Sequence, residues 1–458
     1  MKRFALIGSD LTFTQAKWLH SELGDYEYNL VDIRSEDELE GVLRSNTYDG
    51  FNITHPFRSV AGKYIDELSR DAERSGVVNV VKKLPDGRLR GYNADMDAFR
   101  YLLNDSAEGK QCTILGSGAA ARSAATVLSD LGASEVIMVS HRPEEAAERL
   151  GDPYTVTGYS RLWQCYGSEI IVNCTGIGKY PDVEESPLSK ERLSVRPFTG
   201  LELAIDLAYN PYRTKFLQDA RRLTGCHTKS GLDMLIVQAI TSRRIWMDEP
   251  HDAEIDDHVV QQLKRKILDR QLNVVAVGLP GSGKTTIFRR YAYELGLRFI
   301  DTDEETEKLM GCTIQEALTD SSIGEEFFRA MEHQAVRNLC SVRGAVIATG
   351  GGTLLNPVNR DLLRANGIVI YVKRPLELLA VKGRPISINT GVKELFEGRD
   401  RIYRRVSDLS LINSRIFGEI RERTGEGNSY NYELKGFVYY IARKVNKYLS
   451  ELAANTWT

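Results

Sequence analysis

The chain has 458 residues, of which 42% are hydrophobic and 27% charged, and its formal net charge is −3. This composition is typical of a soluble folded protein, and the length suggests two to four domains at about 150 residues each. The small negative charge disfavours nucleic-acid binding, and no apolar run reaches the roughly 18 residues of a membrane span. We therefore expect small-molecule partners, no nucleic acid and no membrane.

The first residues and the cysteines bear on the compartment. The opening segment, MKRFALIGSD, has only a short apolar patch, which suits a first strand better than a signal peptide. The six cysteines lie far apart and form no CxxC or Cys/His cluster, so we expect neither zinc nor a disulfide framework. These features predict a cytoplasmic protein with reduced thiols. A homodimer is compatible with the sequence, which does not fix the oligomeric state.

Short apolar runs alternate with helical patterns almost throughout, which predicts an α/β fold. In residues 1–100 we expect strands at 3–8, 28–33 and 50–54, helices at 16–24 and 36–44, and a hairpin over 77–93. Asp86-Gly87 should form the turn of that hairpin. A second strand–helix series has its strands at 111–115, 135–140, 169–174 and 203–208.

A glycine-rich turn, GSGAAA, follows the strand at 111–115 and precedes a helical pattern. It matches the G-x-G-x-x-A turn, which places a pyrophosphate at a helix N-terminus. Alone this is a weak signal, because glycine-rich turns between strand and helix are common. The candidate cofactor-binding residues of the turn are Gly116, Gly118, Ala119 and Ala120.

The strand at 135–140 ends in Ser140, and His141 and Arg142 follow it. An NAD-binding protein usually has Asp or Glu at this point, where a carboxylate accepts hydrogen bonds from the ribose hydroxyls. A histidine and an arginine suit the 2′-phosphate of NADP instead. We therefore predict NADP(H) as a cofactor, contacted by these three residues.

The alternating pattern breaks once, at the acidic stretch 248–257. A charged helical segment at 259–270 then leads into a new apolar strand, NVVAVG, at 273–278. We place the joint between two independent units here, as a linker helix over 248–271.

The segment GLPGSGKTT, residues 278–286, is the strongest motif of the chain. Glycines in this G-x4-G-K-T spacing let backbone N–H groups converge on phosphates, Lys284 supplies a charge, and the Thr285 hydroxyl can bind Mg²⁺. A strand before it and a helix after it support ATP binding. The candidate residues are Gly278, Gly281, Ser282, Gly283, Lys284, Thr285 and Thr286.

Downstream residues suit a small substrate that carries a carboxylate and hydroxyls. A strand over 299–301 ends at Asp301, which could orient the water shell of the metal, and Asp303 could face a substrate hydroxyl. Further on come Arg329, the glycine run 350–352 that contains Gly351, then Arg384 and Arg399. Arginine binds carboxylates in a planar fork, which makes these arginines candidates for substrate and phosphate contacts.

From about 272 to 458 these motifs, in this order, resemble the shikimate kinase family. The resemblance implies a P-loop α/β fold like that of nucleoside monophosphate kinases, with ATP and Mg²⁺. It also implies that shikimate is held by Asp303, Arg329, Gly351 and Arg399. Arg384 would be a mobile lid residue near the phosphates. A kinase for another small polyol acid remains the weaker alternative.

Residues 1–247 resemble shikimate dehydrogenase in the order and spacing of several landmarks. These are NITHP at 52–56, Asn79, GYNAD at 91–95, DLAYNP at 206–211 and GLDMLIVQ at 231–238. The resemblance implies an α/β substrate domain followed by a Rossmann-type NADP domain. It implies roles at the substrate for Thr14, Asn52, Thr54, Asn79, Asp95, Tyr209 and Gln238.

The sequence departs from the shikimate dehydrogenase pattern at one position of the expected catalytic site. Arg58 stands at the position of the family's catalytic lysine, which would pair with Asp95. Arginine effectively cannot give up its proton near neutral pH. Arg58 could still orient a hydroxyl, while Lys63, the nearest lysine, is expected to be solvated. Two alternatives follow: an active dehydrogenase, which we favour, or a degenerate half that senses ligands or takes a related substrate.

The sequence thus predicts a bifunctional enzyme. The first half would reduce 3-dehydroshikimate to shikimate with NADPH, and the second would phosphorylate shikimate with ATP. We expect a substrate domain at 1–100, completed by helices at about 229–247, an NADP domain at 101–228, the linker helix and a kinase domain at 272–458. The alternative is an active kinase with a non-catalytic, ligand-sensing head.

Overall fold

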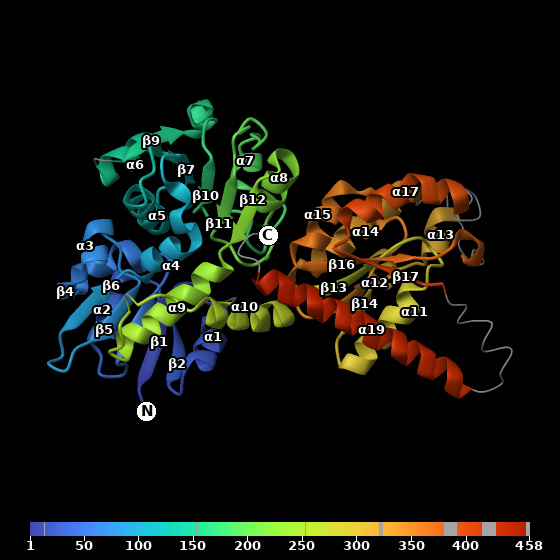
Figure 1. The fold of residues 1–458 in the computed structure, drawn as a ribbon, viewed down its shortest axis with the longest axis horizontal. Coiled ribbons are helices and arrows are strands. Elements are labelled where there is room, and N and C mark those ends of the chain that lie inside the picture. Colours follow the sequence, from blue (N-terminus) through green and yellow to red (C-terminus); the bar gives the residue numbers. More distant parts are fainter. Residues whose placement is uncertain are drawn as a thin grey trace.

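The fold consists of three successive β-sheets, each covered by helices (Figure 1). The computed structural model describes residues 1–12, 14–151, 154–251, 253–319, 324–379, 392–414 and 427–454. Each sheet is formed by one continuous stretch of the chain, so the α/β organisation expected from the alternating pattern is confirmed.

The first sheet is mixed and has the strand order β2-β1-β3-β5-β6-β4. Its strands are β1 (Arg3–Gly8), β2 (Glu27–Asp32), β3 (Gly50–Ile53), β4 (Glu67–Leu68), β5 (Val80–Lys83) and β6 (Leu89–Tyr92), and its helices are α1 (Ala16–Leu23), α2 (Glu36–Arg44), α3 (Arg70–Ser75) and α4 (Ala94–Leu103). Strands β5 and β6 pair antiparallel, which confirms the predicted hairpin.

A helix from later in the chain, α9 (Leu232–Trp246), packs against this first unit. The Trp246 ring stacks on Phe4 with 4.2 Å between centroids, and its indole N–H donates to the Val81 carbonyl at 3.0 Å. Helix α9 therefore packs on the first unit, although all strands of the second sheet lie between them in the sequence.

The second sheet is entirely parallel, with the order β12-β11-β10-β7-β8-β9. Its strands are β7 (Gln111–Leu115), β8 (Glu135–Ser140), β9 (Thr155–Gly158), β10 (Ile170–Asn173), β11 (Leu203–Asp206) and β12 (His227–Ser230), and its helices are α5 (Ala119–Asp130), α6 (Pro143–Leu150), α7 (Pro187–Lys190) and α8 (Lys215–Thr224). The strand order reverses between β7 and β10, and ligands of such sheets bind at this point, beyond the carboxyl ends of the strands.

The third sheet is also parallel, with the order β14-β15-β13-β16-β17. Its strands are β13 (Asn273–Val277), β14 (Phe299–Asp301), β15 (Val346–Ala348), β16 (Gly367–Lys373) and β17 (Leu409–Ile412). Its helices are α11 (Lys284–Leu295), α12 (Thr302–Met310), α13 (Ile314–Thr319), α14 (Gly324–Asn338), α15 (Pro357–Ala365), α17 (Val392–Val406) and α19 (Gly427–Ala454).

Helix α10 (Asp257–Gln271) covers the expected helical segment and is packed between the two halves of the protein (Figure 1). It contacts α9 on one side and α19 on the other. Lys264 and Asp233 form a salt bridge of 3.0 Å there, with both side chains less than 10% exposed, namely 4% and 7%. One hydrophobic cluster runs without interruption from α5 and α9 through α10 into α11 and α19. The two units expected to be independent therefore share a core.

No helix in the described ranges is long and apolar enough to cross a membrane.

Candidate functional site

The first candidate site centres on Asp95, near the start of α4. The Asn93 side chain caps this helix by accepting a hydrogen bond from the Asp95 backbone N–H at 3.2 Å. This bond holds the Asp95 backbone in place. The Arg58 Nη1 atom lies 2.7 Å from Asp95 Oδ2, and Arg58 Nε donates to the Ile53 carbonyl at 3.1 Å. The Asp95 side chain is 1% exposed and that of Arg58 is 21% exposed, so Arg58 is the more accessible partner of the ion pair.

Two polar atoms beside this pair have no hydrogen-bond partner among the residues that the structure describes. They are Asp95 Oδ1 and Asn79 Nδ2, and both are buried. Asn79 Oδ1 is used inside the protein, because it accepts from the Ala94 backbone at 2.8 Å. A buried polar atom without a partner costs free energy, so both atoms suit hydrogen bonds to a bound hydroxyl compound.

Asn52 has its side chain engaged within the protein. Its Oδ1 accepts from the Tyr28 hydroxyl at 2.8 Å, and its Nδ2 donates to Ser242 Oγ at 2.8 Å. His20 stacks on Tyr28 at 3.9 Å, and burial lowers the pKa of His20 to about 3. Asn52 therefore ties β3 to α9 through a neutral buried network that supports the floor of the site.

The remaining predicted substrate residues come from three separate segments. Thr54 follows β3, and its methyl group lies so close to Gly8 that a Cβ there would meet it at 2.3 Å. Burial raises the pKa of Tyr209, while hydrogen bonds to Thr14 and to the Gln15 backbone oppose that shift. The structure thus brings Thr14 and Tyr209 together. Gln238 is half-buried on α9, the helix that Asn52 contacts.

Lys63 does not take part in this site. Its Nζ atom lies 3.1 Å from Glu36, and its side chain is 64% exposed. The expectation that Lys63 is solvated is confirmed, so it does not replace the lysine whose position Arg58 occupies.

A cavity of about 440 Å³ lies beyond the carboxyl ends of β7, β8 and β10. It contains five of the predicted cofactor residues, Gly116, Gly118, Ser140, His141 and Arg142. Ala119 and Ala120 begin α5 just behind it. Gly116 has a φ of +112°, which favours glycine, and a Cβ there would meet the Cys174 backbone at 3.4 Å. The turn can therefore bring its backbone close to a phosphate.

Several cavity residues were missed by sequence reasoning. Arg149 on α6 reaches back to the turn and donates to the Ser117 carbonyl at 2.7 Å. Ser117, Cys174 and Thr175 line the cavity as well, and so does His55 from the NITHP segment of the first unit. His55 shows that the cavity reaches from the second sheet towards the Asp95 site. Only the fold brings Arg149 to the turn, since no motif marks it.

The second candidate site is built on the loop between β13 and α11. Lys284 Nζ donates to the carbonyls of Gly278 and Leu279 at 2.8 and 2.9 Å, so the loop folds around its lysine. Gly283 has a φ of +91°, and a Cβ there would lie 2.7 Å from Asn413 Nδ2. Ser282 is buried, and its carbonyl accepts from Asn413. These features fit a phosphate-binding loop.

Thr285 and Asp301, the two residues expected to bind a metal, are hydrogen-bonded to each other. Thr285 Oγ1 donates to Asp301 Oδ2 at 2.9 Å, and Asp301 Oδ1 caps α12 by accepting from the Asp303 backbone at 3.0 Å. A hydroxyl and a carboxylate are suitable oxygen donors for Mg²⁺, which is usually bound by one or two carboxylates together with substrate phosphates.

Asp303 is the most perturbed acid of this site. Burial, followed by the nearby carboxylates of Asp301 and Glu332, raises its pKa to about 7, and Lys284 opposes the shift. A carboxylate with a pKa near the working pH is suited to accept a proton. A Cβ at Gly350 would lie 2.2 Å from Asp303 Oδ1, so the first glycine of the run leaves room for this side chain.

The other two glycines of the run contact the two arginines of the site in different ways. A Cβ at Gly352 would lie 2.5 Å from Arg329 Nη1, and Arg329 is held by Glu332 at 3.0 Å. The Gly351 carbonyl accepts from Arg399 at 2.7 Å and from Tyr403 at 2.6 Å. The glycine run thus seats both arginines.

These residues share one cavity of about 540 Å³. It is lined by Gly281, Gly283, Lys284, Thr285, Thr286, Asp303, Arg329, Gly351 and Arg399 from the prediction, and by Pro280, Glu307, Thr313, Ile314, Gln315, Leu318, Phe328, Glu332, Thr349 and Gly352. The sequence prediction missed Glu332 as the group that holds Arg329, although the FRxxE pattern contains it. Arg384 lies outside the described residues.

Two family models match the chain. The shikimate dehydrogenase substrate binding domain matches residues 11–81, and shikimate kinase matches residues 280–416. A shikimate dehydrogenase (NADP(+)) of Caldicellulosiruptor bescii is 32% identical over 268 residues, which cover 54% of this chain and 90% of that protein. One of Methanothermobacter thermautotrophicus is 33% identical over 238 residues, covering 50% of this chain and 81% of that protein.

Solved structures agree over the same half. A chorismate mutase/shikimate 5-dehydrogenase fusion protein of Clostridium acetobutylicum is 31% identical with a TM-score of 0.51, covering 57% of this chain and 96% of that one. Shikimate dehydrogenase 1 of Peptoclostridium difficile is 29% identical with a TM-score of 0.52, covering 58% and 98%.

Proposed function

Because the chain belongs to the shikimate dehydrogenase family over its N-terminal half and carries a shikimate kinase domain in its C-terminal half, we propose that it catalyses two consecutive steps of the shikimate pathway. The first half reduces 3-dehydroshikimate to shikimate, and the second phosphorylates shikimate to shikimate 3-phosphate. The observation that carries the proposal is that each half has its own nucleotide cavity next to groups suited to a hydroxylated acid.

In the first half, Asp95 and Arg58 act as a unit at the reacting oxygen. NADPH supplies the hydride when bound. Arg58 donates a hydrogen bond to the oxygen that gains charge, because a guanidinium keeps its proton, while Asp95 holds Arg58 in place. The proton reaches that oxygen through water. Asn79 Nδ2 and Asp95 Oδ1 bind neighbouring hydroxyls.

In the second half, positioning and charge compensation carry most of the catalysis. Asp303 orients the attacking hydroxyl and accepts its proton, which its raised pKa permits. Lys284 compensates charge on the transferred phosphoryl, and Arg329 and Arg399 hold the substrate carboxylate. ATP with Mg²⁺ at Thr285 and Asp301 supplies the phosphoryl group when bound.

A second function is favoured by one observation, the arginine at position 58. If proton transfer requires a lysine there, the first half binds NADP or shikimate without turnover and regulates the kinase. The regulatory and the catalytic function use the same contacts to NADP and shikimate. They differ only in whether the first half turns its substrate over.

Four finer statements belong to this proposal. The preference for NADP over NAD rests on His141 and Arg142 together with the names of the relatives. The requirement for Mg²⁺ rests on the Thr285–Asp301 pair. The protein's location in the cytoplasm rests on the six well-separated cysteines. Its domains are 1–100 with 229–247, then 101–228, the linker helix 248–271, and 272–458.

The decisive experiment is the NADP-dependent oxidation of shikimate by the full chain without ATP, with an Arg58→Lys variant measured in parallel. Turnover by the native chain supports the bifunctional enzyme and a role for arginine in the reaction. If only the Arg58→Lys variant oxidises shikimate, the first half of the native chain is not an active dehydrogenase, and the regulatory function replaces the bifunctional one. Phosphorylation of shikimate, measured separately with ATP and Mg²⁺, tests the second half.

A further inference from the structure

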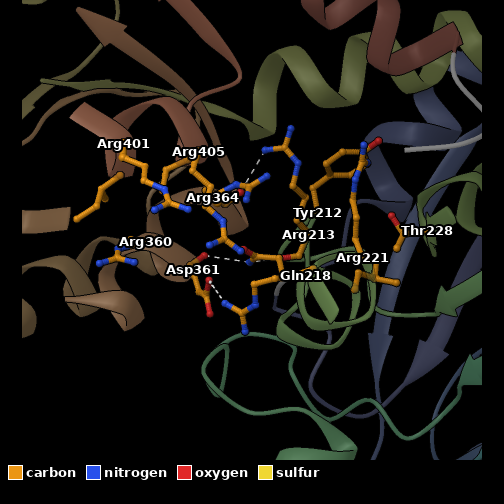
Figure 2. Close-up of a pocket in the computed structure, with 14 residues that line it drawn as sticks. Tyr212, Arg213, Gln218, Arg221, Thr228, Arg360, Asp361, Arg364, Arg401 and Arg405 are labelled. Atoms are coloured by element: carbon orange, nitrogen blue, oxygen red, sulfur yellow. Dashed lines mark hydrogen bonds and ion pairs between the residues drawn. The ribbon is translucent and has the colours of Figure 1, made fainter. Parts of the chain in front are cut away.

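A third cavity, of about 390 Å³, lies between the two halves and belongs to neither site described above (Figure 2). Its walls come from α8 and the loop before it on one side and from α15 and α17 on the other. Seven arginines line it, Arg213, Arg221, Arg222, Arg360, Arg364, Arg401 and Arg405, against a single acid, Asp361.

Most of this positive charge is not compensated. Arg213 pairs with Asp408 at 3.3 Å, and Arg222 pairs with Asp219 and with Asp361. For the other five arginines, Arg221, Arg360, Arg364, Arg401 and Arg405, the described part of the chain offers no carboxylate within salt-bridge distance. Among the residues that the structure places, Arg360 donates only to the carbonyls of Leu354 and Leu355.

The arrangement on the helices is unfavourable without a counter-ion. Arg360 and Arg364 are four residues apart on α15, and Arg401 and Arg405 are four apart on α17. Residues at this spacing lie on the same helix face, and like charges there repel each other. Arg364 Nε is buried without a hydrogen-bond partner among the described residues. Burial and neighbouring arginines also lower the pKa of Arg360 and of Arg364, and Asp361 opposes this shift for both.

The cavity size and its other walls restrict the ligand. A volume of about 390 Å³ suits a small molecule and not a peptide or a polynucleotide. Leu217, Ile402 and Val406 add apolar surface for a carbon skeleton. Several guanidinium groups in one small space require a high charge per volume, and a phosphate monoester carries about −1.5 to −2 where a carboxylate carries −1.

We propose that this cavity binds a small anion with two or more negative charges, at least one of them on a phosphate group. The ligand contacts both halves at once, through α8 on one side and α15 and α17 on the other. The inference does not depend on the reactions proposed above, because it uses residues outside both catalytic cavities.

The test is calorimetric titration of the full chain with inorganic pyrophosphate, with 3-phosphoglycerate and with citrate. Saturating NADP⁺ and ADP, without Mg²⁺, keep the two nucleotide sites occupied. We expect one further binding event for a phosphate-bearing probe. Tighter binding of pyrophosphate would indicate an inorganic phosphate ligand, and tighter binding of 3-phosphoglycerate would indicate an organic one. Binding of citrate alone, or of no probe, would overturn the proposal.

Variants locate the binding event. Arg364→Gln combined with Arg405→Gln should weaken it at least about tenfold, since charge-assisted hydrogen bonds are lost. Arg196→Gln removes one positive charge from an exposed position outside the cavity and should leave the binding event unchanged. Arg364→Lys with Arg405→Lys keeps the charge and should bind with intermediate affinity, which separates a lost site from a misfolded chain. Equal affinity of all variants would refute the location.

Discussion

Arg58 Nη1 lies 2.7 Å from Asp95 Oδ2 in a pair of which the carboxylate is almost completely buried. An unpaired buried charge is far more costly than a paired one, so the two side chains depend on each other for stability as well as for position. Asp95 Oδ1, the second oxygen, is buried without a protein partner in the described ranges, which suits a hydrogen bond to a ligand.

Asp95→Asn should reduce the oxidation of shikimate by NADP⁺ by at least about a hundredfold, because the amide cannot hold Arg58 through charge. Initial rates of NADPH formation give the result. The kinase reaction of the same variant is the control and should be unchanged. A variant with native oxidation rates would show that Asp95 has no part in the reaction.

Arg58→Ala should destabilise the chain by about 3–5 kcal/mol, since it leaves the buried Asp95 carboxylate without its partner. Urea unfolding followed by circular dichroism measures this. The double variant Arg58→Ala/Asp95→Asn removes both charges and should recover part of the loss. If the double variant is no more stable than Arg58→Ala, the buried charge is not the cause.

Lys284→Ala should abolish phosphorylation of shikimate, because the variant lacks the only side-chain charge contributed by the phosphate loop. Coupled detection of ADP gives the rate. Binding of NADPH, followed by its fluorescence, should stay native and shows that the first half remains folded. Native kinase turnover in the variant would contradict the assignment of the loop.

Asp303→Asn should abolish kinase activity and at the same time stabilise the protein. The pKa of Asp303 is raised to about 7, so the folded state holds this proton where the unfolded state has released it. Stability is therefore lost as pH rises from about 4 through 7, and the asparagine removes that loss. The variant should gain up to about 4 kcal/mol at pH 8 and less at pH 5.5.

Urea unfolding at the two pH values checks this prediction. A gain that is equal at both would mean that Asp303 does not titrate between them. The native kinase should also lose kcat/KM as pH falls through about 7, because protonated Asp303 cannot accept the hydroxyl proton.

Arg213→Ala should loosen the contact between the two halves. Its guanidinium donates to Gly367 O at 2.8 Å and to the Tyr448 hydroxyl at 3.0 Å, besides pairing with Asp408. Calorimetry should show one unfolding transition for the native chain and two, or a broadened one, for the variant. Arg196→Gln is the charge-matched control. An unchanged single transition in Arg213→Ala would show that other contacts suffice.

Much of the fold could be predicted from residue patterns alone. Strands β8 and β13 lie where apolar runs placed them, because such runs are buried in parallel sheets on both faces, and β1 lies in the parallel part of the mixed first sheet. The hairpin of β5 and β6 followed from Asp86-Gly87. Local signals of this kind need no knowledge of the rest of the chain.

The site residues were predictable only where a motif contains them. Gly283 and Lys284 are fixed by spacing, and the structure places both in the cavity. Arg149 and His55 reach the nucleotide cavity from elements that only the tertiary fold brings together. The arginine cavity could not be predicted from the sequence either, because only the tertiary fold brings α8 next to α15 and α17.

The segment before α8 joins the halves in a way that pattern reasoning did not anticipate. The Arg213 backbone donates to the Ala365 carbonyl at 2.9 Å, and the Tyr212 backbone donates to Asn366 Oδ1 at 2.9 Å. Gln271 bridges Tyr209 O at 2.9 Å and Asn366 Oδ1 at 3.1 Å. The connection was expected to be a simple linker helix.

These contacts limit how either half could be replaced by the corresponding domain of a related protein. Tyr209 lies in the same short loop that Gln271 and Asn366 hold, so replacing the C-terminal half by a free-standing kinase would leave this loop without its partners. A transplanted half would have to bring matching groups at both positions. Changes at the surface between the two units must therefore be matched on both sides.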